Sequence, residues 1–297
     1  MKQNTAFIFP GQGSQYEGMA KLFIDDETAK PFFKAFSTLL KYSFVDLSSD
    51  KLSSTQVTQP ALYTMSCIHF THLKNKDYTP QFVAGHSLGE YSALYAAGVF
   101  SFEQGLELVA YRGMLMHEAS LNNAGTMAAI IGLSHDKISL LCEQAQDFGV
   151  VEAVNINSDK QIVISGNHQA VEVVCQKAKE MGAKRAILLP VSAPFHSSLM
   201  LQIREKFQEK IESIPFKKAE LMVVQNVDAC VHQDPHQIKQ NLISQLYSPV
   251  PWVSCMQELK NRGAQHFIEC GPGKVLSSLA RSMSYSVQAS EDLLNMQ

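Results

Sequence analysis

Short apolar runs alternate with longer helical patterns over the first 122 residues. The runs at 6–9 and 82–84 have the length and composition of buried strands. A helix is predicted over 102–119, because Ser101 can cap its first turn and Gln104 can bond back to the cap, while Gly98 ends the preceding helix. This alternation is typical of a mainly parallel sheet covered by helices.

A different order of elements follows from residue 125. The patterns predict a strand at 127–133, a helix at 137–146, strands at 151–155 and 161–165, a helix at 169–181 and a strand at 185–189. This β-α-β-β-α-β order is that of a ferredoxin-like domain. The first pattern then resumes, with a helix from Ser197, a strand at 221–225, helices at 238–246 and 251–261, and a strand at 266–269.

These patterns predict an α/β fold with two domains. A large hydrolase-like domain, with a mainly parallel sheet flanked by helices, would comprise residues 1–122 and 197–297. A small ferredoxin-like domain, residues 123–196, would be inserted in it. At 297 residues with 45% hydrophobic content, the chain can build cores for both.

Composition and charge limit the possible binding partners of the protein and its cellular compartment. A formal net charge of −3 gives no general attraction to nucleic acid or to an anionic membrane. No run approaches the roughly 18 apolar residues of a membrane-spanning helix, and the run at 6–9 is too short for a signal-peptide core. The six cysteines are scattered without a C-x-x-C pair, which indicates reduced thiols. We therefore expect a cytoplasmic protein.

The stretch from Gly85 to Gly89, GHSLG, matches the G-x-S-x-G pattern of a nucleophile elbow. The predicted strand at 82–84 precedes it and a helical pattern follows it, which is the context that an elbow requires. The glycines allow a tight turn, and the helix N-terminus presents free N–H groups to an anion. Ser87 is therefore the predicted nucleophile, and an ordinary turn serine is the alternative.

A second glycine loop, Pro10 to Gln15, follows the first strand, PGQGSQ in sequence. Loops of this kind meet at the carboxyl edge of a parallel sheet, so this loop can reach the same site as Ser87. The backbone amide of Gln12 could then join that of Leu88 in stabilising an oxyanion. A plain strand-to-helix turn is the alternative. Neither glycine pattern of nucleotide-binding loops is present.

Arg112 is an unusual residue within its predicted helix. Its neighbours one turn away, at 108, 109, 115 and 116, are all apolar. Burying a guanidinium costs several kcal/mol unless an anion pairs with it, so either an internal carboxylate or the carboxylate of a ligand is expected there. The residues alone leave both alternatives open.

Histidines and cysteines offer weaker signals. His196 precedes a predicted helix where the chain returns from the small domain to the large one, and a lone histidine is more often structural than catalytic. Cys230, His232 and His236 lie close together on a polar loop, but no second pair of ligands accompanies them. We therefore predict no metal site.

Seven motifs, taken together and in order, resemble one family. They are FPGQGSQ at 9–15, GHSLGEY at 85–91, RG at 112–113, VN at 154–155, PFHS at 194–197, QLYSPV at 245–250 and GPGKVL at 271–276. They closely resemble the malonyl-CoA:acyl-carrier-protein transacylases of bacterial type II fatty acid synthesis. The resemblance runs from about residue 7 to about residue 282.

The resemblance implies transfer of a malonyl group from malonyl-CoA to the phosphopantetheine thiol of acyl carrier protein. The transfer would be ping-pong, through a malonyl ester on Ser87. His196 would be the base, oriented by the backbone carbonyl of Gln245. The backbone amides of Gln12 and Leu88 would stabilise the oxyanion.

The resemblance also implies roles in binding. Arg112 would hold the malonyl carboxylate, Asn155 would help to arrange the site, and Phe195 is typical of malonyl-using members. The acidic carrier protein would dock on a local basic patch, for which Lys184 and Arg185 are the candidates. No cofactor is implied, because the CoA thioester is a substrate and the carrier brings its own phosphopantetheine. We expect a monomer.

Two other functions remain as alternatives. Freestanding acyltransferases that serve polyketide synthases are close relatives of the family, and the same motifs fit them. An α/β-hydrolase esterase or thioesterase also has G-x-S-x-G, but it usually places an acid and then a late histidine after the serine. In this chain, His196 falls in the middle.

Overall fold

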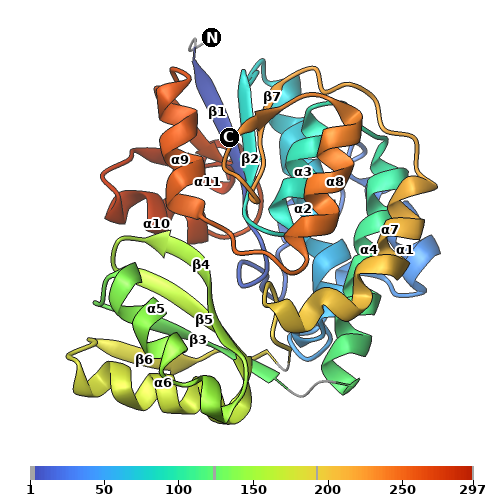
Figure 1. The fold of residues 1–297 in the computed structure, drawn as a ribbon. Coiled ribbons are helices and arrows are strands. Elements are labelled where there is room, and N and C mark those ends of the chain that lie inside the picture. Colours follow the sequence, from blue (N-terminus) through green and yellow to red (C-terminus); the bar gives the residue numbers. More distant parts are fainter. Residues whose placement is uncertain (1–3, 123–124, 192, 296–297) are drawn as a thin grey trace.

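The structure is a computed structural model that describes residues 4–122, 125–191 and 193–295. Its strands form two sheets (Figure 1). The larger sheet has the order β10-β9-β1-β2-β7-β8, formed by β1 (Thr5–Phe9), β2 (Phe82–Gly85), β7 (Met222–Val224), β8 (Val231–His232), β9 (His266–Glu269) and β10 (Val287–Ala289). All neighbours in it are parallel except β8, which runs antiparallel to β7.

Helices cover both faces of this sheet, because alternate residues of a strand point to opposite faces. Phe7 and Phe9 of β1 belong to the core on one face. The helices that contribute to this core are α1 (Lys30–Leu40), α2 (Thr55–Asn75), α3 (Gly89–Ala96), α4 (Phe102–Asn122), α7 (Arg204–Glu212), α8 (Pro235–Gln245) and α11 (Ser290–Asn295). Ala6 and Ile8 pack on the other face with α9 (Trp252–Asn261) and α10 (Val275–Ser282). None of the helices in the described part of the chain has the length and hydropathy that crossing a membrane requires.

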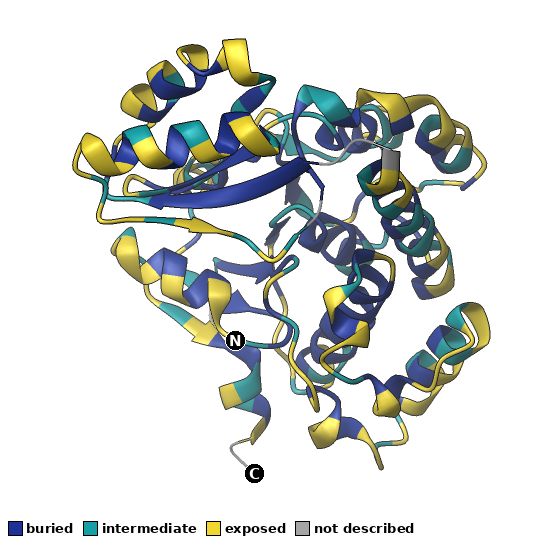
Figure 2. Cartoon of the chain, turned by 90° about the horizontal axis from the view of Figure 1, so that it is seen from below, coloured by how far each residue is buried: buried dark blue, intermediate teal, exposed yellow. Residues whose placement is uncertain are grey.

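The smaller sheet is antiparallel and has the order β4-β5-β3-β6. Its strands are β3 (Gly125–Ile131), β4 (Val151–Ser158), β5 (Gln161–Asn167) and β6 (Arg185–Leu188), and α5 (His135–Glu143) and α6 (His168–Glu180) cover one face. Its other face packs against the larger part of the molecule through Met127, Ala129 and Val163. Figure 2 shows the inner strands of both sheets buried and the outer helix faces exposed.

The predicted fold class is confirmed, since a mainly parallel sheet with helices accompanies the β-α-β-β-α-β unit. The predicted elements are present with shifts of a few residues at their ends. The strand predicted over 127–133 ends at Ile131, where Gly132 turns the chain with a φ of 100°. The predicted boundary at residue 123 lies outside the described residues, and the division into domains at 123 and 197 stays a prediction.

The helix predicted from Ser197 differs from the observed structure. Residues Ser198–Ile203 form a 3-10 helix, and the α-helix begins only at Arg204. The reason is local competition for hydrogen bonds. The Ser197 hydroxyl donates to the Pro194 carbonyl at 2.6 Å, and Ser198 donates from both its backbone and its hydroxyl to the Glu152 carboxylate at 2.8 Å.

Candidate active site

The turn from β2 into α3 carries Ser87 at the carboxyl edge of the larger sheet. Ser87 adopts a left-handed conformation with a φ of 51°. The glycines on either side permit close backbone contact: a Cβ on Gly85 would lie 1.9 Å from the carbonyl carbon of Gly89, and a Cβ on Gly89 would lie 2.0 Å from the carbonyl oxygen of Phe9. The sequence folds here as a nucleophile elbow because no larger residue fits at either glycine.

Ser87 and His196 meet although they are far apart in the sequence. His196 Nε2 lies 2.7 Å from Ser87 Oγ, and His196 Nδ1 lies 2.8 Å from the backbone carbonyl oxygen of Gln245. Since a carbonyl can only accept, Nδ1 carries the ring proton and Nε2 is the acceptor. His196 can therefore take the proton of Ser87 as a general base.

His196 is buried, with 3% of its surface exposed, and has a left-handed φ of 63°. Burial, and after it the nearby positive charge of Arg112, lower its pKa to about 3. The hydrogen bond from Nδ1 to Gln245 acts in the opposite direction but is smaller. The imidazole is therefore neutral at pH 7, the form that a general base requires.

We expect the rate of acylation by malonyl-CoA to show no acid limb near pH 6.5, the ordinary pKa of histidine. His196 becomes protonated only well below that pH, so its protonation should not slow the reaction between about pH 5 and 8. His196→Ala should acylate about 10² times more slowly or worse, through loss of the base. Rapid-quench mass measurements, with circular dichroism at each pH as the folding control, check both results. A limb near pH 6.5 in folded protein would contradict the neutral base.

Arg112 is 1% exposed and contacts only neutral groups. Its two terminal nitrogens donate to Gln59 Oε1 at 2.7 Å, and to Gln245 Oε1 and Ser87 Oγ at 3.2 Å each. Its Nε has no partner in the described part of the chain. No carboxylate oxygen of a described residue lies within 4.0 Å of the guanidinium. Burial lowers the pKa of Arg112, and the buried Glu90 carboxylate acts in the opposite direction from beyond this distance, so of the two alternatives for a direct partner the geometry favours a ligand carboxylate.

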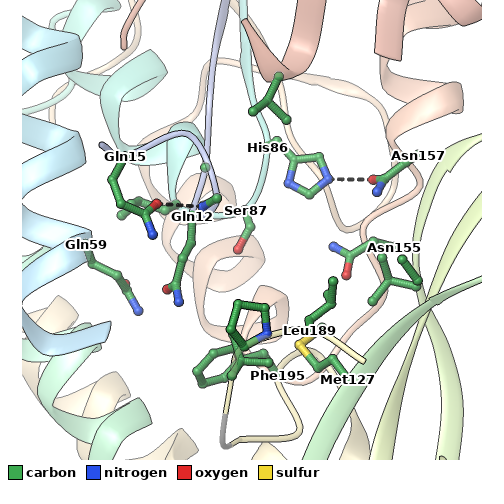
Figure 3. A pocket seen from close by; sticks show the side chains of 18 of the residues that line it. Gln12, Gln15, Gln59, His86, Ser87, Met127, Asn155, Asn157, Leu189 and Phe195 are labelled. Atoms are coloured by element: carbon green, nitrogen blue, oxygen red, sulfur yellow. Dashed lines mark hydrogen bonds between the residues drawn. The ribbon is translucent and has the colours of Figure 1, made fainter. Parts of the chain in front are cut away.

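These groups line a pocket of about 500 Å³ between the larger and smaller sheets, a size typical of small-molecule sites. Ser87 and Asn155 enter it from opposite sides (Figure 3), and Phe195, Met127 and Leu189 also line it. Asn155 is buried on β4 and reaches the pocket from the smaller sheet. The pocket thus places the predicted nucleophile, the guanidinium and an apolar wall around one space.

Gln12 and Leu88, the predicted oxyanion donors, both line this pocket. The Gln12 side chain also belongs to a chain of hydrogen bonds. Its Oε1 accepts from the Thr55 hydroxyl at 2.9 Å, that hydroxyl accepts from Gln59 Nε2 at 2.9 Å, and Gln59 Oε1 accepts from Arg112. The glycine loop is therefore connected to the buried cation.

Lys184 and Arg185 are exposed at the start of β6, the edge strand of the smaller sheet. Arg185 pairs with Ile131 on β3, which pairs in turn with Gln161 on β5, a residue of the pocket lining. Directly opposite side chains share a face of a sheet, so Arg185 lies on the pocket face. Lys184 precedes it and lies on the other face. Only Arg185 of the two is thus near the rim.

Sequence reasoning missed four polar residues around this site. Gln59 contacts Arg112, Asn157 Oδ1 lies 2.8 Å from His86 Nε2 in the pocket lining, and Asn226 and Glu90 lie behind Ser87. Two of them carried a signal. Asn157 lies two residues after Asn155, the spacing of one strand face, and Asn226 directly follows a predicted strand.

Comparison with known proteins shows to which class of protein this chain belongs. A family model described as "Acyl transferase domain" matches residues 6–292. The chain therefore belongs to the acyl transferase family and is an acyltransferase. Within this family it is similar to the malonyl CoA-acyl carrier protein transacylase of Staphylococcus aureus (strain COL). The two are 42% identical over 290 residues, which cover 96% of this chain and 94% of the relative.

Solved structures agree with this placement. The acyl-carrier-protein S-malonyltransferase of Burkholderia pseudomallei 1710b aligns with a TM-score of 0.93 at 39% identity, covering 99% of this chain and 100% of the other. A malonyl-transacylase in complex with its type II PKS acyl-carrier protein aligns with a TM-score of 0.92 at 38% identity, covering 97% and 95%. The predicted family is confirmed.

Proposed function

We propose that this enzyme transfers a malonyl group from malonyl-CoA to the phosphopantetheine thiol of acyl carrier protein. The observation that carries the proposal is the buried guanidinium of Arg112, which lies 3.2 Å from Ser87 Oγ and contacts only neutral groups among the described residues. A nucleophile beside a cation that no carboxylate of the described residues contacts directly suits an acyl group that ends in a carboxylate. The names of the relatives support the same substrates.

In the first half-reaction, Ser87 Oγ attacks the thioester carbonyl while His196 Nε2 takes its proton. The backbone amides of Gln12 and Leu88 stabilise the oxyanion. The carbon–sulfur bond then breaks, the imidazolium returns the proton to the CoA sulfur, and a malonyl ester remains on Ser87. Arg112 pairs with the free carboxylate throughout.

In the second half-reaction, the carrier's thiol gives its proton to His196 and attacks the ester carbonyl. The Ser87 oxygen leaves and takes the proton back, which restores the free enzyme. Asn155 faces Ser87 across the pocket and helps to arrange the acyl group, and Phe195 closes the apolar side. Every group that these steps need comes from the chain or its substrates, so the proposal includes no cofactor.

Intact mass measurement after brief mixing with malonyl-CoA or acetyl-CoA, with and without carrier protein, tests the proposal. We expect one malonyl adduct, little acetyl adduct, and transfer of the malonyl group to the carrier when it is added. Release of the acyl group to water faster than transfer to the carrier would instead favour an esterase, and equal acetyl and malonyl adducts would contradict the preference for malonyl.

A second candidate function is the same malonyl transfer to a different acyl carrier protein. The relative solved with a type II PKS acyl-carrier protein supports a role in polyketide synthesis. Comparison of kcat/KM for a fatty acid carrier and a polyketide carrier separates the two. We further propose a cytoplasmic monomer, and light scattering of the purified protein tests the oligomeric state.

The carrier should dock near Arg185 and Lys184. Because the carrier is acidic, Arg185→Glu should raise its KM roughly tenfold at low salt, the range of electrostatic steering, without slowing acylation by malonyl-CoA alone. Lys184→Glu should have a smaller effect, since Lys184 lies on the face away from the pocket. Lys179→Glu is the control, because Lys179 is exposed on α6, which covers the opposite face of the sheet. Equal carrier KM values for wild type and Arg185→Glu would place the docking surface elsewhere.

A further inference from the structure

Asn226 lies directly behind the nucleophile elbow. Strands β7 and β2 are parallel neighbours, with Val224 paired to Ala84. Asn226 and Ser87 follow the carboxyl ends of these two strands, so they reach the same edge of the sheet. Asn226 has no exposed surface, and its side chain does not line the pocket.

The side-chain amide of Asn226 holds the elbow at two points. Its Oδ1 accepts from the backbone N–H of Ser87 at 2.8 Å, and its Nδ2 donates to the carbonyl oxygen of Gly85 at 2.8 Å. Its Oδ1 also accepts from Gln245 Nε2 at 3.3 Å. Gln245 is the residue whose backbone carbonyl orients His196. One side-chain amide therefore contacts the backbone of the Ser87 turn and also Gln245, the residue that orients His196.

Glu90 fixes Asn226 in turn. The Glu90 carboxylate has no exposed surface and accepts from the backbone N–H of Asn226 at 2.7 Å and from Gln225 Nε2 at 2.9 Å. Glu90 lies in the first turn of α3, and its own N–H donates to the Ser87 carbonyl at 3.1 Å. The carboxylate thus joins the segment after β7 to the helix that follows the nucleophile.

These hydrogen bonds determine which backbone N–H is free to bind an oxyanion. The N–H of Ser87 is already bonded to Asn226, so the following amide, that of Leu88 at the start of α3, is the one that can meet an oxyanion. Ser87 also holds a φ of 51°, which a residue with a side chain adopts only when its surroundings impose it. Without Asn226, the buried N–H would lose its partner and the turn would relax.

We propose that Asn226 is a positioning residue for acyl transfer, which holds the backbone of Ser87 so that Oγ meets His196 and the Leu88 amide stays free for the oxyanion. This inference rests on the proposed function of the same site. An amide supplies the acceptor for Ser87 and the donor for Gly85 in one side chain of this size, and it stays neutral at every pH at which the enzyme is folded.

Asn226→Ala tests the proposal in single-turnover acylation by malonyl-CoA. The maximal rate should fall about 10²-fold or more, because displacement of the nucleophile by about 1 Å has that effect. The malonyl-CoA concentration for half-maximal rate should change little, since Arg112 and the pocket stay in place. Asn167→Ala is the matched control, because Asn167 Oδ1 also accepts a backbone N–H, that of Val150, at 2.8 Å, in the smaller sheet. The control should keep the wild-type rate.

In Asn226→Asp the side chain keeps its shape. This variant therefore tests the proposal even if Asn226→Ala does not fold. A protonated aspartate accepts and donates as asparagine does, whereas an ionised one cannot donate to the Gly85 carbonyl. The rate of this variant relative to wild type should therefore rise as the pH is lowered. Arg112 and His196 are common to both proteins. Burial raises the pKa of Glu90 to about 7, and Glu90 contacts residue 226, so the ratio is also measured in a Glu90→Gln background, which removes the titration of Glu90.

Two results would overturn the proposal: a wild-type acylation rate in Asn226→Ala, or a pH-independent ratio for Asn226→Asp. Absence of any malonyl adduct on the wild-type enzyme would overturn the proposed function instead. Intact mass and the thermal midpoint of each variant are recorded in the same samples, so a loss of fold is distinguished from a loss of positioning.

Discussion

Replacing Arg112 by alanine is expected to remove the preference for a malonyl over an acetyl thioester. An acetyl group leaves the buried guanidinium unpaired, and a site built around such a group can reject the smaller substrate by up to about 10⁴ to 10⁵. Without the arginine, the malonyl carboxylate would enter the pocket with no counter-ion, so its acylation should fall steeply. Acetyl transfer should stay level or rise.

The measurement is kcat/KM for both thioesters, in a variant whose thermal midpoint has been determined. Arg112→Lys is the graded control, because it keeps the charge but loses the planar pair of donors that matches a carboxylate, and it should be intermediate. A parallel loss for both substrates would contradict the proposed role of Arg112. Such a loss would indicate that the guanidinium is needed only for the hydrogen bonds to Gln59 and Gln245.

Ser87→Ala should form no malonyl adduct while the protein stays folded. The hydroxyl contacts His196 and Arg112 but packs little apolar surface, so its removal should cost little stability. Ser87→Cys is the matched variant: its thiol is a nucleophile of similar size and should be malonylated as a thioester. Intact mass after mixing with malonyl-CoA, followed by peptide mapping, checks both variants.

An adduct of Ser87→Ala on another residue would end the assignment of the nucleophile. Binding must be measured separately from reaction, because the pocket and Arg112 remain in this variant. Tight binding of malonyl-CoA without an adduct is the expected combination. Loss of binding as well would indicate a disturbed pocket.

Where the sequence carried a local signal, the fold could be predicted. The cap of α4 is an example: the Ser101 N–H donates to Gln104 Oε1 at 2.9 Å, and the Gln104 N–H donates to Ser101 Oγ at 3.3 Å, as a capping box requires. Helix α2 is the opposite case. Most of its residues are buried, so it has no polar stripe to mark its period, and Pro60 lies inside it. No bounds could be predicted for it.

The residues of the site also differ in whether the sequence around them carries a signal. Ser87 and Arg112 are marked by their immediate neighbours in the chain, an elbow motif and an apolar stripe. Gln59 has no such mark, because its partner Arg112 lies 53 positions away. Asn226 directly follows a predicted strand, but this position does not show that its partner is Ser87, 139 positions away. The contact of His196 with Ser87 likewise depends on the path of the chain after the smaller sheet. Only the assembled fold brings these residues together.

Both members of the proposed dyad have positive φ angles, 51° at Ser87 and 63° at His196. A residue with a side chain is destabilised by roughly 1–2 kcal/mol in the left-handed region, whereas glycine is not. Laboratory evolution that rewarded only heat resistance would therefore enrich glycine at these two positions and yield robust but inert proteins. Any programme to make this enzyme more heat-resistant has to select for turnover in every round.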